Sequence, residues 1–530
     1  EKHADDLAVP RGPQLFRCKA VPAVNYAGFM HRIVAVMALA FGLLVPAARA
    51  DEAFRIGLTA MPPQLGNPYG VVGTTSNFVM PAIYDRLAGF DNDGVLQPML
   101  AVGWERRDVL TWAFNLRQGV VFSNGEPWNA HAAKSVLETL RGPQGVGLFG
   151  ANEPRELADV IVEDDYTLLM TTAKPNAALP RNIYVVFYVP PKYLERVGIE
   201  GLTSQPIGSG PFVVDAWEPD KIELSANQTS WRPPKVGHLE LRALPEAIAR
   251  VQAAIAGEID VAIAVDPVQI PALEAAGLRM AERTPARLLS IVFNTLKKGS
   301  PFADERVRQA VNYGVNRKAI TEMLLAGLVE PASQGAIPGA LGYDPDIKPY
   351  PYDPDKARAL LKEAGYEKGF TFTFEMPGGA TSADSSVFQS IASDLAKVGI
   401  NMRIHVIPFA QFSKYYVQGG AEGEALPADY NLYAYDALRT MFGPSGTHGC
   451  DWSAPRFCDR AIQDVIDAAG TAATLEERVE LTRQAVRAYH DTAESLLLFP
   501  VLGLDAIGPR VGHWETWADT IQYHTISLKP

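Results

Sequence analysis

Several short patterns in the sequence could support chemistry, and the first is a glycine-rich hexapeptide. Gly145–Gly150 reads G-V-G-L-F-G, which is the spacing of a dinucleotide-binding loop. Such a loop binds pyrophosphate when a strand leads into it and a helix starts from it, because the phosphates meet the helix N-terminus. Here a predicted helix precedes the glycines, and Asn152-Glu153-Pro154 follows them. This context is wrong for a nucleotide site.

The patterns of common catalytic sites are missing. The sequence contains no G-x-x-x-x-G-K-[ST], no H-E-x-x-H and no G-x-S-x-G nucleophile elbow. Gly443-Pro444-Ser445-Gly446 lacks the elbow spacing. With 9 histidines and 60 acidic residues, some carboxylate–histidine pairs must occur by chance. Since no nucleophile, base and oxyanion site are assembled, we expect no catalytic residue, no cofactor and no resident metal.

Two cysteines lie close together in the sequence, and they could form a disulfide or bind a metal. Cys450 and Cys458 form an even pair, because Cys18 falls in a segment that we expect the mature protein to lack. An even pair in an exported chain is typical of a disulfide. His448 nearby raises the alternative of a metal site. The spacing and the single histidine do not match a zinc site, so we predict the disulfide.

The N-terminal region has the pattern of an export signal. Met30 is followed by a basic pair, an unbroken apolar run over Ile33–Val45, and Ala48-Arg49-Ala50, which has the form of a cleavage site. We therefore predict a Sec-type signal peptide at 30–50 and a periplasmic mature protein. The apolar run is shorter than the ~20 residues that span a bilayer. Residues 1–29 are expected to be an upstream segment that is not part of the mature protein.

Composition excludes several classes of protein. The chain has 530 residues, 47% of them hydrophobic, and a formal net charge of -12. This is ordinary for a globular chain and excludes a collagen-like or wholly disordered one. The acidic balance argues against nucleic-acid binding, which requires a basic surface. Because no other segment is apolar enough to cross a membrane, we expect no direct membrane insertion.

Apolar periodicity predicts an α/β architecture. Trp112, Phe114 and Leu116 alternate with polar residues, as in a half-buried strand. A helix is predicted from Pro245 to Gly257, with Ile248, Val251 and Ile255 on its buried face. Further strands are expected at 54–59, 212–214, 221–225, 261–265, 289–294, 370–374 and 400–407; helices are expected after the caps Asn129, Asp304, Asn316 and Asp353 and at 388–398 and 475–489.

Six ordered blocks of the sequence are similar to the motifs of one transport family. The blocks are Ile83–Glu105, Trp112–Gly125, Gly208-Ser209-Gly210-Pro211-Phe212, Gly257-Glu258-Ile259-Asp260-Val261, Phe293–Ala310 and Tyr352–Tyr366. On these blocks, the chain from Asp51 to about Leu528 resembles the family 5 extracellular solute-binding proteins of ABC importers. That family includes dipeptide-, oligopeptide- and nickel-binding proteins. One departure is Ala132, where the family usually has an acidic helix-start residue, and it bears on a local cap only.

The resemblance implies a bilobed α/β periplasmic-binding-protein fold (type II, the large variant with three subdomains) with a ligand cleft between the lobes. Lobe I is expected to comprise 51–288 and the returning segment 496–530, with an inserted subdomain at roughly 75–200. Lobe II is expected to comprise 289–495. Chain crossovers near Leu288 and Leu496 then form the hinge. Closure of such hinged lobes around a ligand is the signal that a permease reads.

The resemblance also points to one segment for ligand binding. Peptide-binding members hold the ligand's α-amino group with the aspartate of a W-x-x-D stretch, since a buried ammonium needs a carboxylate partner. Here the matching segment lacks the tryptophan. One register places Tyr433 and Asp436 at the aromatic and acidic positions; the other places Tyr435 and Leu438 there. The first register is favoured, because it pairs an aromatic wall with an acid.

Arg439 opens an alternative, because a guanidinium can clamp a carboxylate bidentately. With Thr440 it is similar to an arginine–threonine pair of the nickel-binding branch, in which His448 could be a metal ligand. A structural ion pair within the lobe is an equal alternative for Arg439. Asn67 lies in a turn resembling the family's early D-P turn, and it is either a ligand contact or part of a simple turn; Asn294 is the remaining expected ligand contact.

The sequence therefore predicts a monomeric, non-enzymatic binding component of an ABC importer. It would take a short peptide or similar small solute and deliver it to the permease and its ATPase subunits. A carboxylated or opine-like solute, or a nickel chelate, is the second hypothesis. An exported enzyme on the same scaffold is the third.

Overall fold

The computed structural model describes residues 53–530, apart from 71–73, 286, 379–381, 432–434, 443–448, 453, 502 and 519. The predicted signal peptide lies outside the described residues. Among the described residues, no helix combines the length and the apolar character needed to cross a bilayer.

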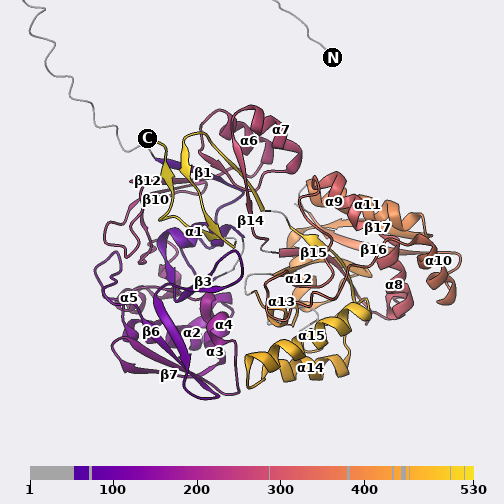
Figure 1. Ribbon diagram of the computed structural model, residues 1–530, viewed down its shortest axis with the longest axis horizontal. Coiled ribbons are helices and arrows are strands. Elements are labelled where there is room, and N and C mark those ends of the chain that lie inside the picture. Colours follow the sequence, from indigo (N-terminus) through magenta and orange to yellow (C-terminus); the bar gives the residue numbers. More distant parts are fainter. Residues whose placement is uncertain are drawn as a thin grey trace, which may run out of the picture. The chain divides into compact units, whose positions relative to one another are not determined.

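Two larger sheets and one smaller sheet organise the described chain. The first has seven strands in the order β10-β11-β12-β1-β13-β20-β14, the second has five in the order β17-β16-β18-β15-β19, and the third has four in the order β5-β6-β8-β7. We call the part built on the seven- and four-stranded sheets lobe I (53–285 and 503–530), and the part built on the five-stranded sheet lobe II (287–500). Figure 1 shows β1, β10 and β12 of lobe I, and β15, β16 and β17 of lobe II.

The strands predicted in the two larger sheets are present, although the one expected at 261–265 covers only Val261–Ala262, and β12, β14, β18, β19 and β20 were not predicted. The seven-stranded sheet contains β1 (Phe54–Leu58), β10 (Phe212–Trp217), β11 (Lys221–Ala226), β12 (His238–Ala243), β13 (Val261–Ala262), β14 (Arg279–Arg283) and β20 (Gly503–Ile507). The five-stranded sheet contains β15 (Arg287–Phe293), β16 (Phe370–Pro377), β17 (Ile400–Ile407), β18 (Ala425–Asn431) and β19 (Ser495–Pro500). The four-stranded sheet contains β5 (Ala101–Arg106), β6 (Thr111–Leu116), β7 (Leu157–Asp164) and β8 (Thr167–Thr172).

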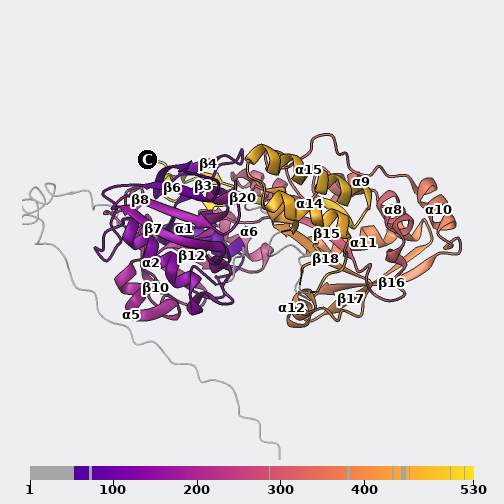
Figure 2. The same ribbon diagram turned by 90° about the horizontal axis from the view of Figure 1, so that it is seen from below.

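Helices cover these sheets. Lobe I carries α1 (Thr74–Ile83), α2 (Ala130–Arg141), α3 (Asn152–Glu156), α4 (Leu179–Asn182), α5 (Pro191–Gly201), α6 (Ala247–Ile255) and α7 (Ile270–Ala275). Lobe II carries α8 (Glu305–Gly314), α9 (Arg317–Leu324), α10 (Pro354–Glu363), α11 (Ser382–Ala396), α12 (Phe409–Gln418), α13 (Ala437–Phe442), α14 (Arg460–Gly470) and α15 (Leu475–Asp491). In both views α14 and α15 lie side by side, as do α8 and α10 (Figure 2).

The predicted helix caps are confirmed. The side chain of Asn129 accepts a hydrogen bond from the Ala132 N–H at 2.9 Å and starts α2. Asp304, Asn316 and Asp353 cap α8, α9 and α10 in the same way. Each cap satisfies a backbone N–H that has no partner within its helix, which is why these short polar residues mark helix starts.

The predicted buried face of α6 is wrong at Ile248, which is 71% exposed. Val251 is buried as expected, but Arg250 is 2% exposed and occupies the inner face. Its guanidinium donates to the carbonyl oxygens of Leu244 at 2.6 Å, Ile263 at 2.8 Å and Ala264 at 2.7 Å. Because buried polar groups need hydrogen-bond partners, the side of α6 that carries Arg250 faces these carbonyls, and the side that carries Ile248 faces solvent.

The chain passes between the lobes along paired strands. In lobe I, β14 and β20 are antiparallel neighbours, and Arg283 pairs with Gly503. In lobe II, β15 and β19 are antiparallel neighbours, and Leu288 pairs with Pro500. The Val501 N–H donates to the Arg287 carbonyl at 2.8 Å. The strands that flank the two crossovers are therefore paired in both lobes, and the predicted crossover points, Leu288 and Leu496, lie within β15 and β19.

A buried carboxylate organises the interior of lobe I. Asp85 is fully buried and forms an ion pair with Arg232, which is also buried. It also accepts hydrogen bonds from Ser209 Oγ at 2.8 Å and Trp231 Nε1 at 2.9 Å. Ser209 belongs to the G-S-G-P-F block and Asp85 to the first block, so this network joins two of the recognised motifs.

His524 lies near this network and is held neutral. Burial, and next the charge of Arg232, lower the pKa of His524 to about 4. Its buried Nδ1 has no hydrogen-bond partner among the described residues. The pKa in the unfolded chain is about 6.5, so the unfolded state binds the proton first as the pH falls. We expect the stability that depends on His524 to be complete above pH ~6.5 and to be lost as the pH falls toward 4.

The comparison of wild type with His524→Gln tests this pH dependence. Urea unfolding at pH 7.5 and pH 5 should show a smaller loss of stability in the variant than in the wild type. Equal losses in both proteins would show that His524 does not contribute.

Candidate functional site

An aromatic cluster joins the two lobes and contains one of the predicted ligand-binding residues. The ring centroid of Phe90 lies 4.8 Å from that of Tyr184, also in lobe I, and 5.3 Å from that of Tyr435 in lobe II. Leu438 of α13 is part of the same buried cluster. The segment that the sequence singled out for ligand binding therefore lies at the contact between the lobes.

Tyr435 has an unusual backbone. Its φ is +45°, in the left-handed region that residues with a side chain seldom adopt. Its carbonyl oxygen accepts a hydrogen bond from Arg181 Nη2 in lobe I at 3.0 Å and from the Leu341 N–H in lobe II at 2.8 Å. Such strained residues persist when their surroundings fix them, and they concentrate at functional sites.

Asp436 has its carboxylate engaged within lobe II. The residue is 1% exposed, and Oδ2 accepts from Arg478 Nη2 at 2.7 Å. Oδ1 accepts from the Leu438 N–H at 3.0 Å and so caps α13. A ligand ammonium at Asp436 would have to share this carboxylate with Arg478. The predicted role of Asp436 as the amine partner therefore stays a prediction that the geometry does not favour.

Arg439 forms an ion pair with Glu153 across the lobe contact. Arg439 comes from α13 and Glu153 from α3 of lobe I, so the pair is not the structural pair within one lobe that the sequence left open. Burial, and next the charge of Arg478, lower the pKa of Arg439 to about 10. The sequence gives no sign of Glu153, because an acid before a proline in a short connecting helix follows no ligand-binding pattern.

Cationic and anionic side chains both lie at or beside the lobe contact. Arg181, Arg439 and Arg478 are cationic, whereas Glu153 and Asp436 are anionic. Burial lowers the pKa of Arg181, and the charge of Asp436 opposes that effect. Because charges removed from water lack the stabilisation that water gives, this place favours a ligand whose charged groups pair with the protein's own charges.

The remaining residues predicted to contact a ligand make local hydrogen bonds, or lie outside the described residues. Thr440 is buried, and its N–H donates to the Asp436 carbonyl inside α13 at 2.9 Å. Asn67 accepts from the Tyr69 N–H at 3.0 Å, and the Tyr69 carbonyl bonds the Gly150 N–H just before α3. Asn294 extends β15, with its N–H donating to the Glu424 carbonyl at 2.8 Å. Tyr433 and His448 lie outside the described residues.

The predicted disulfide is confirmed. Cys450 and Cys458 are bonded with a Cα–Cα distance of 4.6 Å. The loop that they close includes the buried Arg456, whose carbonyl accepts from the Thr295 N–H at 2.8 Å, one residue after Asn294. The loop that the disulfide closes thereby contacts the chain just after β15 through Arg456. Among the described residues, no group of three or more acidic, histidine or cysteine side chains could hold a metal ion.

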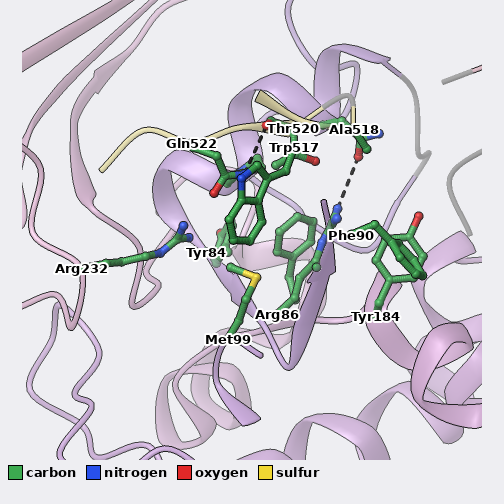
Figure 3. A pocket seen from close by; sticks show the side chains of 14 residues that line it. Tyr84, Arg86, Phe90, Met99, Tyr184, Arg232, Trp517, Ala518, Thr520 and Gln522 are labelled. Carbon is green, nitrogen blue, oxygen red and sulfur yellow. Dashed lines mark hydrogen bonds between the residues drawn. The ribbon is translucent and has the colours of Figure 1, made fainter. Parts of the chain in front are cut away.

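A small cavity of about 40 Å³ lies in lobe I beside the aromatic cluster and shares Phe90 and Tyr184 with it (Figure 3). Its polar wall is Arg86, which donates to Asn77 Oδ1 at 3.3 Å and stacks over Phe187 at 4.1 Å. Its volume is far below the ~300–1,000 Å³ of typical ligand pockets, so the cavity is a small void beside the lobe contact and no ligand pocket in itself.

Comparison with known proteins identifies the class of molecule. The family model described as bacterial extracellular solute-binding proteins, family 5 Middle, matches residues 95–430. The glutathione-binding protein GsiB of Salmonella typhi is 30% identical over 351 residues, which cover 65% of this chain and 68% of that protein. No function of this chain follows from that name alone.

Solved structures share the fold. NikA of Brucella suis, in complex with Fe(III)-EDTA, has a TM-score of 0.77 at 21% identity and covers 90% of this chain and 100% of its own. DppA of Helicobacter pylori, in complex with the peptide STSA, has a TM-score of 0.75 at 22% identity over 90% and 98% of the two chains. The predicted α/β solute-binding fold is thus confirmed, and the absence of enzymatic motifs agrees with the role of such proteins. The chain belongs to the bacterial extracellular solute-binding proteins of family 5, the non-enzymatic substrate-binding components of ABC importers.

Proposed function

We propose that the protein is the periplasmic binding component that captures a short peptide or similar small solute by closure of lobe I on lobe II, and that it delivers this ligand to the permease. The observation that carries the proposal is the set of charges at the lobe contact, the buried Glu153 and the half-buried Arg181 and Arg439. Fixed charges of both signs in a desolvated place select ligands by charge, because each charge left unpaired is costly.

The relatives support a peptide-like ligand. The matched curated proteins carry the name glutathione-binding protein, and glutathione is a short peptide with free amino and carboxylate groups. A solved structure of the same fold contains the dipeptide Met-Leu. We therefore place a free peptide first among the ligand classes.

A carboxylated solute or a metal chelate is the second candidate, and the arginines favour it. Arg181 and Arg439 both reach the lobe contact, and guanidinium groups bind carboxylates well. Structures of the same fold hold Fe(III)-EDTA and Ni(L-His), whose carboxylates surround the metal.

Thermal denaturation of refolded, ligand-free protein tests the proposal. Glutathione or Met-Leu at a hundredfold excess over Kd should stabilise the folded state by ~2.7 kcal/mol and raise the Tm by several degrees. Nickel–histidine and dicarboxylates form the comparison set. A rise in Tm with nickel–histidine or dicarboxylates, and none with either peptide, would favour the second candidate and contradict the first.

A further inference from the structure

Glu153 is buried without the hydrogen bonds that a carboxylate normally needs. The residue is 2% exposed, and no described residue other than Arg439 offers its carboxylate a hydrogen-bond donor. Its one ion-pair partner among the described residues is Arg439. A buried carboxylate is stable only when it is paired and well hydrogen-bonded, so Glu153 lacks part of its stabilisation in this state.

Arg439 lies opposite Glu153, on lobe II. The neighbouring acid, Asp436, is already bound to Arg478, so the guanidinium of Arg439 turns to Glu153. Both charged groups come from elements that belong to different lobes, α13 and α3. Separation of the lobes therefore exposes one anion and one cation, each without its partner.

Asn182 of lobe I carries another buried acceptor. Asn182 is 4% exposed, and its Oδ1 accepts no hydrogen bond from the described residues. Asn182 ends α4 and precedes a short 3₁₀ turn at Ile183–Val185, against which α3 packs. Like the carboxylate of Glu153, this oxygen is an acceptor, and two acceptors suit a donor such as an ammonium group.

We propose that the zwitterionic end of the ligand inserts between Glu153 and Arg439, with its ammonium on Glu153 and its carboxylate on Arg439. The inference rests on the proposed function and names the ligand chemistry that the same site selects. One ion pair between the lobes is exchanged for two ion pairs through the ligand, so the buried charge stays balanced.

The two simpler ligand classes fit this pair less well. A ligand with only a cation would take Glu153 and leave the half-buried Arg439 without a partner, and a ligand with only an anion would leave the buried Glu153 without one. Either case leaves an uncompensated charge at the lobe contact, which is destabilising. A group that carries both charges, as at the α-carbon of a free amino acid or across a short peptide, satisfies both residues.

The test uses the full mature protein and two probes, glutathione and the dipeptide Met-Leu, in isothermal titration calorimetry. The probe that binds wild type is then titrated into Glu153→Gln and Arg439→Gln. Each variant should bind at least ~30-fold more weakly, because each leaves one charge of the ligand buried without a partner. Glu156→Gln, an exposed acid on the same helix, and Arg460→Gln, an exposed arginine at the start of α14, are the matched controls and should bind as wild type does.

Blocked ligands test the inference without any change to the protein. N-acetyl-Met-Leu and Met-Leu amide each lack one charge, and each should bind wild type at least ~30-fold more weakly than Met-Leu. The double variant Glu153→Arg with Arg439→Glu restores an ion pair between the lobes but presents the charges reversed. It should recover thermal stability without recovering affinity.

The outcomes separate this inference from the function on which it rests. If neither peptide binds wild type, the peptide function is wrong, and this inference is wrong with it. If a peptide binds wild type and the two single variants stay within threefold, the function stands and the inference is overturned. Full affinity in the reversed double variant would also overturn it, because the pair would then only hold the lobes together.

Discussion

Replacing Asp436 with alanine is expected to lower the free energy of unfolding by about 3–5 kcal/mol. The substitution removes the partner of Arg478, whose side chain is 4% exposed, and leaves a guanidinium buried without a counter-charge. It also removes the cap of α13 at the Leu438 N–H. Chemical denaturation of ligand-free protein measures the loss, and the absence of ligand is essential, since a binding residue would show little effect there.

A second pair of variants distinguishes this structural role from ligand binding. Replacing Asp436 with leucine and Arg478 with methionine together should cost less than Asp436→Ala alone, because no buried charge is then left unpaired. If Asp436→Ala instead leaves stability unchanged and abolishes peptide binding, Asp436 is the amine partner that the resemblance implied.

Replacing Gly208 with alanine is expected to cost about 3 kcal/mol or more, because the new methyl group has no space. A Cβ at this position would lie 2.0 Å from the Ile83 carbonyl oxygen and 2.7 Å from the ring of Tyr84. The carbonyl cannot move away freely, since it accepts the Gly210 N–H at 2.9 Å. The fall in Tm of purified protein measures the effect.

A matched glycine serves as the control for Gly208. Gly103 lies in β5, has ordinary backbone angles and, apart from its chain neighbours, has no atom within 4 Å of the place that a Cβ would take. Gly103→Ala should change stability by less than ~0.5 kcal/mol. Similar Tm values for the two variants would show that close packing on Ile83 is not what requires glycine at position 208.

Much of the fold could be predicted because its signals are local. A cap such as Asp304 and the apolar positions of α8 lie within one short segment, so their spacing suffices. The disulfide likewise joins two neighbouring cysteines in sequence. Local patterns fail where a distant partner changes the outcome, as at α6. There, carbonyls of the following β-strand region draw Arg250 inward and leave Ile248 in solvent.

The candidate site was predictable only in part. The motif resemblance led to the segment around Tyr435, Asp436 and Arg439, and that segment does lie at the lobe contact. The partners of these residues were hidden, because Glu153 and Arg478 are far away in sequence and belong to no motif. In the sequence, a carboxylate that binds a ligand cannot be distinguished from one that pairs with an arginine. The two differ only in the folded protein, where the arginine lies beside the carboxylate.

The paired crossovers have a mechanical consequence. Arg283 pairs with Gly503 on the lobe I side of the crossovers and Leu288 pairs with Pro500 on the lobe II side, so the strands that flank the crossovers form a narrow antiparallel ribbon on each side. Such a ribbon bends easily across its flat face, but it resists shear, because sliding one strand past the other breaks backbone hydrogen bonds. We propose that these paired strands act as the hinge and confine relative motion of the lobes to bending about one axis.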